Sequence, residues 1–385
     1  MKDGIINVYK PPGMTSNDVI YKVRAALGIK KLGHTGTLDP MAEGVLPILI
    51  NRGTRIAEYL DWDLKTYETV ITLGVRTDSL DVTGQVEETC DPSKVTEEDV
   101  VNAFSELLPK RKEGEGRYPE FYGILDQIPP KTSAVRINGR RLYEFVHSGE
   151  EIPEDILSKI RPRKVWIDSL VIDEISLPDI RFTVRCSKGT YIRAISRDIG
   201  DILGPGAVMR SLKRTESGAF NMENAVGLEE LIKVGIESGR VSFIDDEHTK
   251  VRRNVPFGEE IPEDMERFVL GVDFPLGNFG KAMVNPECAR KMLDGWHLSY
   301  REAKVVKDPA QEAWISNLDH EAAEYDKKEK AANIGSHAGL KLHPEYAGTY
   351  RIYEDDGKGR ESFVGIARHS DQYHKLVPIK VFKRI

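Results

Sequence analysis

The chain has 385 residues, of which 40% are hydrophobic and 30% are charged, as expected for a globular protein of about two or three domains. No apolar run approaches the ~18 residues of a membrane span, and Met1-Lys2-Asp3-Gly4 runs directly into a strand-like segment, so we expect no secretory signal. A net charge of −7 gives no sign of a nucleic-acid-binding protein. The three cysteines are widely spaced, which argues against a disulfide framework or a zinc knuckle and fits the cytoplasm.

Helix and strand signals alternate over the first 240 residues. Thr15 or Ser16 caps a helix that carries Val19, Val23 and Leu27 on one face and stops at Gly28. Further helices are predicted after a cap at Thr96 and over residues 189–203. Strands are predicted at residues 5–9, 67–75, 165–175 and 179–186, with a charged loop at 110–117. This order favours an α+β domain over a parallel alternation of strands and helices.

The pattern changes near residue 240. Residues 238–262 are rich in Gly, Pro and Asn and are predicted to be a linker. Short strand candidates follow at residues 268–272, 281–284, 348–353, 362–367 and 379–382, with a helix at 286–293 and a charged helical insertion near 308–332. The sequence therefore predicts a first domain at 1–245 and a small β-rich domain at 246–385.

Two basic stretches contain no acidic residue. One spans residues 131–141 and the other residues 181–193; their basic residues are Lys131, Arg136, Arg140, Arg141, Arg181, Arg185, Lys188 and Arg193. A basic face for RNA and an ordinary solvated surface are both compatible with each stretch.

The stretch Gly33-His34-Thr35-Gly36-Thr37-Leu38-Asp39-Pro40 combines glycines, a histidine, hydroxyls and a carboxylate. Pro40 restrains the backbone of Asp39 away from the helical region, and restrained loops commonly carry function. An Asp-Pro pair taken by itself is equally compatible with a simple turn ahead of a helix.

This stretch and several others, in the same order along residues 4–236, resemble the motifs of TruB-type pseudouridine synthases. Gly33 to Leu46 is similar to the catalytic loop of that family, and a combination of ordered motifs is far more specific than one motif. The other similar segments are Lys10-Pro11-Pro12-Gly13, Lys65-Thr66-Tyr67, Gln127-Ile128-Pro129-Pro130, Gly139 to Glu144, Cys186 to Arg193 and Leu212-Lys213-Arg214.

The resemblance implies a pseudouridine synthase fold with a mixed, mainly antiparallel central sheet, and isomerisation of the uridine at position 55 in the tRNA T loop. Asp39 would be the essential carboxylate, as a nucleophile or as a base at the ribose. Arg193 would pair with it, although a phosphate contact or a surface position is the alternative. Tyr67 would stack on the uracil, whereas its alternation pattern alone favours a core tyrosine.

The resemblance also implies how RNA is held. His34 would fill the space left by the flipped uridine, or be a hydrogen-bonded turn residue, and Leu212 would line the uracil pocket while remaining core. Residues 127–152, here called the RNA-gripping segment, would close on the T arm. The expected RNA contacts are Lys131, Arg136, Arg140, Arg141, Tyr143 and Lys188. No cofactor and no metal are expected.

Some features depart from the family pattern. Thr132 stands where the family usually has a tyrosine, and the second domain is only weakly similar to a PUA-like RNA-binding module. The rival readings are an RNA-guided dyskerin-type synthase and an RNA-binding helper of tRNA folding. Dyskerin-type chains usually carry extra N-terminal sequence and a basic tail, so we expect a stand-alone, monomeric, cytoplasmic enzyme that acts on tRNA without a membrane.

Overall fold

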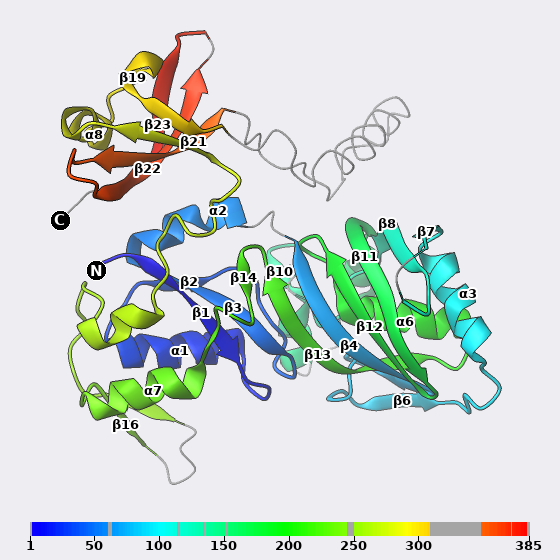
Figure 1. Cartoon of the computed structure of the whole chain (residues 1–385). Helices are drawn as coiled ribbons and strands as arrows, with labels where there is room; N and C mark the ends of the chain where they lie inside the picture. Colours follow the sequence, from blue (N-terminus) through cyan, green and yellow to red (C-terminus); the bar gives the residue numbers. More distant parts are fainter. Residues whose placement is uncertain are drawn as a thin grey trace.

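The computed structural model describes residues 2–60, 64–113, 116–133, 135–148, 150, 152–244, 250–308, 348–370 and 372–382. They form two bodies, each built on its own β-sheet, with the smaller body next to the N-terminal end of the larger (Figure 1). Among these described residues, no helix is both long enough and apolar enough to cross a membrane.

The larger body is organised on a mixed, mainly antiparallel sheet. Its parallel pairs are β1 with β15 and β3 with β13, and the other neighbours run antiparallel. In spatial order the strands are β15 (Val226–Gly227), β1 (Gly4–Lys10), β3 (Glu43–Ile50), β13 (Ala207–Ser217), β4 (Lys65–Leu73), β12 (Asp179–Cys186), β11 (Arg163–Ser176), β8 (Glu120–Gln127) and β7 (Lys110–Lys112). Two short strands lie off this path, β2 (Leu32–His34) on β3 and β14 (Phe220–Asn221) on β13.

Helices bury their apolar faces in one continuous core with this sheet. At the β1 end lie α1 (Ser16–Leu27) and α7 (Leu228–Glu237), and behind the other half lie α3 (Glu97–Leu107) and α6 (Ile192–Leu203) (Figure 1). Capping boxes begin two of them, with Thr15 and Asp18 at α1 and Thr96 and Asp99 at α3. The shared core fixes the start of α1 and the start of α6 relative to the sheet, and both helix starts contribute to the site described below.

Smaller elements complete the larger body. They are the short helices α2 (Ala57–Leu60), α4 (Leu142–His147) and α5 (Glu154–Leu157), the 3₁₀ helices η1 (Asn51–Ile56) and η2 (Glu263–Phe268), and three strand pairs. The pairs are β5 (Val75–Thr77) with β6 (Val86–Thr89), β9 (Arg136–Ile137) with β10 (Arg140–Arg141), and β16 (Val241–Phe243) with β17 (Val251–Arg253).

The smaller body has its own sheet and core. In spatial order its strands are β19 (Leu298–Ser299), β23 (Lys375–Val381), β22 (Glu361–Ser370), β21 (Thr349–Asp355), β18 (Gly280–Val284) and β20 (Lys304–Lys307), with the helix α8 (Pro286–Leu293) and the 3₁₀ helix η3 (Tyr300–Glu302). A mixed hydrophobic cluster joins the two bodies, in which Leu49 and Ile56 of the first pack with Phe279, Ile366 and Phe382 of the second.

Most predicted elements are confirmed, among them the helix that ends at Gly28, the helix that follows Thr96, strands β11 and β12, and helix α8 at its predicted bounds. The charged insertion predicted near 308–332 lies, beyond residue 308, outside the described residues. The domain division at residue 245 stays a prediction; Val251, Ile261 and Met265 belong to the core of the first body.

Three local predictions were wrong. The predicted loop at 110–117 begins with β7, an edge strand whose three side chains are all basic and exposed, so it shows no alternation. The predicted linker at 238–262 contains β16 and β17. The strand predicted at 268–272 is reduced to one bridge between Leu270 and Ile5, because η2 occupies the chain up to Phe268.

Candidate active site

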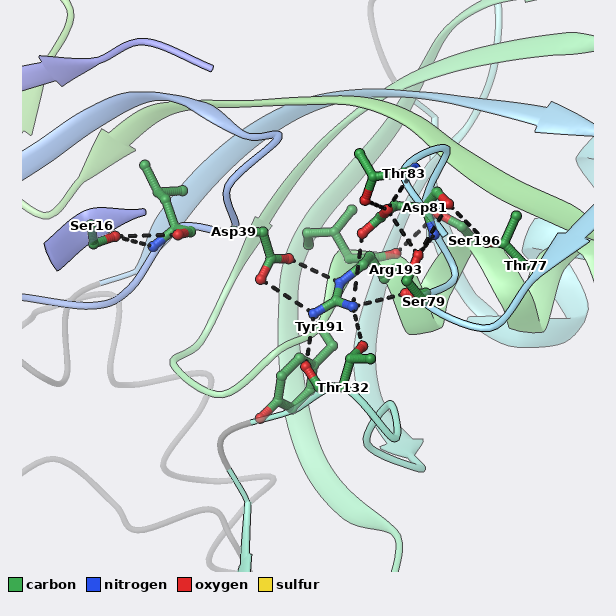
Figure 2. A network of polar contacts seen from close by, with 12 residues as sticks. Ser16, Asp39, Thr77, Ser79, Asp81, Thr83, Thr132, Tyr191, Arg193 and Ser196 are labelled. Atoms are coloured by element: carbon green, nitrogen blue, oxygen red, sulfur yellow. Dashed lines mark hydrogen bonds and ion pairs between the residues drawn. The ribbon is translucent and has the colours of Figure 1, made fainter. Parts of the chain in front are cut away.

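The loop that carries Asp39 joins β2 to β3 and is held by hydrogen bonds from residues of α1 and β1. Ser16, the first residue of α1, donates from its hydroxyl to the Leu38 carbonyl (3.2 Å) and accepts from the Leu38 N–H (2.9 Å). Lys10, at the end of β1, donates from its ammonium to the carbonyl oxygens of Pro40 (3.1 Å) and Ala42. The backbone is therefore held on both sides of Asp39, and its carboxylate points toward Arg193 (Figure 2).

Arg193 contacts both carboxylate oxygens of Asp39. Its Nη2 donates to Oδ1 at 3.2 Å, and its Nε lies 2.9 Å from Oδ2. The Arg193 side chain is 6% exposed and the Asp39 side chain 34% exposed. Because a charge pair of this kind strengthens as water is removed, the arrangement gives a fixed carboxylate with one open side.

Three further partners hold the guanidinium of Arg193 (Figure 2). Its Nη1 donates to the carbonyl of Ser79 (2.8 Å) and to the hydroxyl of Thr132 (2.5 Å), and its Nη2 also reaches the Thr132 carbonyl (3.3 Å). The carboxylate of Asp81 lies 3.9 Å from Nη1. This network sets the orientation of the guanidinium toward Asp39.

Asp81 is a buried carboxylate that sequence reasoning did not single out. It accepts hydrogen bonds from the N–H of Thr83 (3.0 Å), from the Thr83 hydroxyl and from the Ser79 hydroxyl (2.9 Å). The loop that carries it is anchored to β13, since Val82 N–H donates to the Met209 carbonyl at 3.0 Å. The sequence signal was an acid in the short turn after β5, in a stretch rich in Ser, Thr and Gly.

Tyr67 lies in β4 opposite Arg214 of β13, and both residues are buried. Burial raises the pKa of the Tyr67 phenol, and the positive charge of Arg214 opposes that rise. The guanidinium of Arg214 donates from Nε to the Val45 carbonyl (2.7 Å) and from Nη2 to the Gly36 carbonyl (3.2 Å). Arg214 was predicted only as part of a motif, and the structure places it against the loop that carries Asp39.

His34 and Leu212 border the same region. His34 ends β2, and burial together with the nearby charge of Arg214 lowers its pKa, so the neutral imidazole is favoured at neutral pH. Leu212 is buried in β13 opposite Thr69 and belongs to the main core. The predicted core role of Leu212 is confirmed, whereas the contacts of both residues with a uridine stay predictions.

The predicted RNA contacts divide into two groups. Lys131 and Arg136 are exposed, and so is Lys188 ahead of α6. Arg140 and Arg141 are partly buried by their own neighbours: Arg140 pairs with Glu150 (2.7 Å) and lies 3.9 Å above the ring of Phe145, and Arg141 donates to the Tyr143 hydroxyl (2.7 Å). All except Lys188 belong to the RNA-gripping segment.

Gln127, at the start of that segment, is tied to the residue that precedes α6. Its side-chain amide donates to the Tyr191 carbonyl (3.0 Å) and accepts from the Tyr191 N–H (2.7 Å). Tyr191 lies close to Thr132 and Arg193 (Figure 2), and its burial raises the pKa of its phenol. Tyr191 was part of a predicted motif but carried no predicted role.

Two family models match consecutive parts of this chain. The TruB family pseudouridylate synthase N-terminal domain matches residues 24–192, and the tRNA pseudouridylate synthase B C-terminal domain matches residues 193–242. The tRNA pseudouridine synthase B of Clostridium kluyveri is 35% identical over 315 residues, which cover 81% of this chain and 92% of the relative. That of Geotalea uraniireducens is 43% identical over 228 residues, covering 59% and 67%.

Solved structures show the same fold. A structure of an H/ACA RNP bound to a substrate RNA containing 2′-deoxyuridine matches with a TM-score of 0.58 at 20% identity, covering 99% of this chain and 85% of that chain. A Cbf5-Nop10-Gar1 complex matches with a TM-score of 0.59 at 22% identity, covering 99% and 84%. The predicted fold class is therefore confirmed.

Proposed function

The chain belongs to the TruB family of pseudouridine synthases, and from that premise we propose that it isomerises the T-loop uridine of tRNA to pseudouridine. Relatives that share most of this chain are tRNA pseudouridine synthases, which makes this protein a tRNA-modifying isomerase. The observation that carries the proposal is the contact of Arg193 with both oxygens of Asp39, on a loop fixed by Ser16 and Lys10.

In the proposed reaction the bond between ribose C1′ and uracil N1 breaks, and a bond between C1′ and C5 forms. Asp39 starts the reaction, either by attacking the sugar or by removing a ribose proton. N1 ends with a proton, and the C5 proton is lost after the base has rejoined. Tyr67 would stack on the uracil and move that proton; the burial of its phenol next to Arg214 supports this role.

The uridine must leave its stack before Asp39 can reach it, because chemistry on a base in folded RNA requires extrusion into a pocket. Neutral His34 would occupy the vacated space in the T loop, and Leu212 would contact the uracil. The exposed side chains of Lys131, Arg136 and Lys188 would contact phosphates, which predicts binding that weakens with salt.

The second body is proposed to extend the RNA contact as a PUA-like module. Its own core and its sheet of six described strands support an independent unit. The site is assembled from one chain, and its reaction as written needs neither metal nor cofactor. A monomer is therefore proposed, and the three free cysteines support the cytoplasm as its compartment.

The test measures tritium release from a T-arm transcript labelled at uridine C5, with wild type, Asp39→Asn and the control Asp91→Asn. Asp91 is an exposed carboxylate that accepts a local hydrogen bond from Ser93. Release by wild type and the control but not by Asp39→Asn supports the proposal, since the amide keeps the shape and loses the charge.

Equal release by wild type and Asp39→Asn would remove Asp39 from the mechanism. No release by any of the three, with tight transcript binding retained, would instead favour an RNA-guided enzyme or a tRNA-folding protein.

A further inference from the structure

Thr132 joins the RNA-gripping segment to the catalytic ion pair. It lies between β8 and β9, and two of its oxygens accept hydrogen bonds from Arg193: the hydroxyl from Nη1 at 2.5 Å and the carbonyl from Nη2 at 3.3 Å. Figure 2 shows Thr132 and Asp39 both in contact with the Arg193 guanidinium. A residue of the segment predicted to hold RNA therefore binds the same group that holds the catalytic carboxylate.

The hydrogen bonds of Thr132 matter because the guanidinium has a fixed number of donors. Its five N–H groups lie in one rigid plane. The Ser79 carbonyl and the Thr132 hydroxyl accept from Nη1, and the Thr132 carbonyl and Asp39 Oδ1 accept from Nη2. Nε lies 2.9 Å from Asp39 Oδ2 as an ion pair, without a hydrogen bond. Arg193 is only 5% exposed, so water has little access to replace a lost partner. A shift of Thr132 would therefore turn the plane relative to Asp39.

The chain that follows Thr132 has the construction of a small unit with its own core. Val135, Leu142, Phe145 and Ile156 form a hydrophobic cluster separate from the main core. Two backbone bonds close the unit directly behind Thr132, from Tyr143 N–H to the Ser133 carbonyl (3.1 Å) and from Leu142 N–H to the Val135 carbonyl (3.0 Å). The β9–β10 hairpin, which carries Arg136, is part of this unit. The hairpin is therefore linked to Thr132 through the hydrogen bonds and the core of this unit.

We propose that Thr132 is a positioning residue that couples the docking of RNA on the β9–β10 hairpin to the orientation of Arg193 and Asp39. The proposal rests on the proposed tRNA isomerisation, since it assigns a control point for that reaction. The chemical effect belongs to Arg193 and Asp39, and Thr132 acts through them without touching the substrate.

The kinetic test compares Thr132→Val, which removes the hydroxyl at nearly constant volume, with Thr132→Ser, which restores it. The control is Ser158→Ala, which removes an exposed hydroxyl at the residue after α5 that donates to the Asp155 carbonyl (3.2 Å) in the same turn. Single-turnover tritium release is measured with enzyme in excess over a T-arm transcript, and the dissociation constant is measured by filter binding.

The expected result for Thr132→Val is a rate of isomerisation about tenfold lower, equivalent to ~1.4 kcal/mol in the barrier, with an unchanged dissociation constant. Thr132→Ser and Ser158→Ala should react like wild type. A Thr132→Val enzyme with the wild-type rate, or one that Thr132→Ser does not rescue, would overturn the proposal.

Coupling to RNA docking is tested by adding Arg136→Ala to each background. If Thr132 transmits docking, Arg136→Ala lowers the single-turnover rate in the wild-type background and leaves it unchanged in Thr132→Val, so that the two effects are not additive. Fully additive effects would contradict the coupling.

A readout without turnover separates this proposal from the proposed function. In protein labelled with ¹⁵N-arginine, the Arg193 signals are assigned by their loss in Arg193→Lys. Slow rotation of the wild-type guanidinium should give distinct Nη signals, which should average in Thr132→Val and persist in Ser158→Ala. Identical spectra for wild type and Thr132→Val would refute the positioning role even if the wild type isomerised nothing.

Discussion

The ammonium group of Lys10 is buried next to the loop that carries Asp39 and donates a hydrogen bond to the carbonyl oxygen of Pro40 at 3.1 Å. It also donates to the carbonyl oxygens of Pro11 (3.0 Å) and Ala42, so three acceptors face its three N–H groups. Gly13 N–H binds the same Pro40 carbonyl at 2.8 Å. The buried ammonium is stabilised by these carbonyl acceptors and by the nearby negative charges of Asp39, Asp18 and Glu43. It connects the N-terminal strand to the backbone on the far side of Asp39.

We predict that Lys10→Met lowers the rate of isomerisation at least tenfold while tRNA still binds. Methionine fills a similar volume but donates no hydrogen bond, so the Pro11 and Ala42 carbonyls lose the ammonium donor, while Pro40 keeps Gly13 N–H. Each carbonyl left unsatisfied costs about 1–3 kcal/mol. The loop then loses its fixed position around Asp39. Single-turnover kinetics and urea unfolding would measure both effects, with the exposed Lys94→Met as the matched control. A variant as active and as stable as the control would contradict this role of Lys10.

Alkaline pH should change stability and activity in opposite directions through Lys10. Burial, the largest cause, lowers the pKa of Lys10 from 10.5 to about 8. Between these values the unfolded chain keeps the proton that the folded chain releases, so this group adds stability as pH rises, by at most ~1.4 kcal/mol per pH unit. The neutral amine, however, has two N–H groups for three carbonyls, so the loop loosens and activity falls above pH 8.

The measurement for this pH prediction is the difference between wild type and Lys10→Met in urea unfolding at a series of pH values from 7 to about 9.5. The unfolding free energy of wild type minus that of Lys10→Met should be constant below the lowered pKa of Lys10, about 8. Above this pH the difference should increase, because the folded chain has released the proton that the unfolded chain keeps. A difference that is flat over the whole series would show that Lys10 keeps its proton.

The sequence predicted those elements whose signals are local. The helix that ends at Gly28 was predicted because Thr15, three apolar positions and the glycine all lie within that segment. β7 was missed because Lys110, Arg111 and Lys112 are all polar, and their pairing with β8 supplies what their side chains do not. The strand pair β16 with β17 was also missed, because each strand has only three residues and lies among turn residues.

The site shows the same division between local and long-range information. Asp39, Tyr67 and Arg193 were predicted from motifs, and the structure brings Asp39 into contact with Arg193. Asp81 and Thr132 were not predicted as partners of Arg193, because their positions depend on the pairing of β13 with β4 and on the path of the chain after β8. Those contacts join residues far apart in sequence, and no local pattern marks them.

Asp81→Asn should lower the rate of isomerisation about tenfold without changing tRNA affinity. The amide keeps one acceptor oxygen for Thr83 and Ser79, but the negative charge 3.9 Å from Arg193 Nη1 is lost. Of the partners described above, Asp39 is then the one that is charged, and only neutral groups of Ser79 and Thr132 hold the other side of the guanidinium. Single-turnover release and filter binding separate the two quantities. A fall in affinity at an unchanged rate would assign Asp81 to RNA binding instead.

Gly44→Ala should destabilise the fold by about 3 kcal/mol. Gly44 has a φ of 109°, and a Cβ there would lie 2.2 Å from the Arg214 carbonyl oxygen, where β3 approaches β13. The control is Gly239→Ala, with a φ of 75° and no atom within 4 Å of the added Cβ, for which backbone strain alone predicts a cost of about 1–2 kcal/mol. Urea unfolding measures both. An equal decrease in unfolding free energy for Gly44→Ala and Gly239→Ala would show that β3 and β13 move apart at no energetic cost.

Arg136 and Arg140 should contribute differently to RNA binding although they lie on the same hairpin. Arg136 is exposed and forms no ion pair with any residue in the described part of the chain, whereas Arg140 already pairs with Glu150 and lies over Phe145. Each phosphate contact changes the slope of log affinity against log salt by about 1. Arg136→Gln should therefore weaken tRNA binding and reduce that slope by about one, while Arg140→Gln should leave the slope nearly unchanged, because Glu150 already neutralises this charge. Filter binding from low to moderate salt measures the slopes, and equal reductions for both variants would show that Arg140 leaves Glu150 to bind a phosphate.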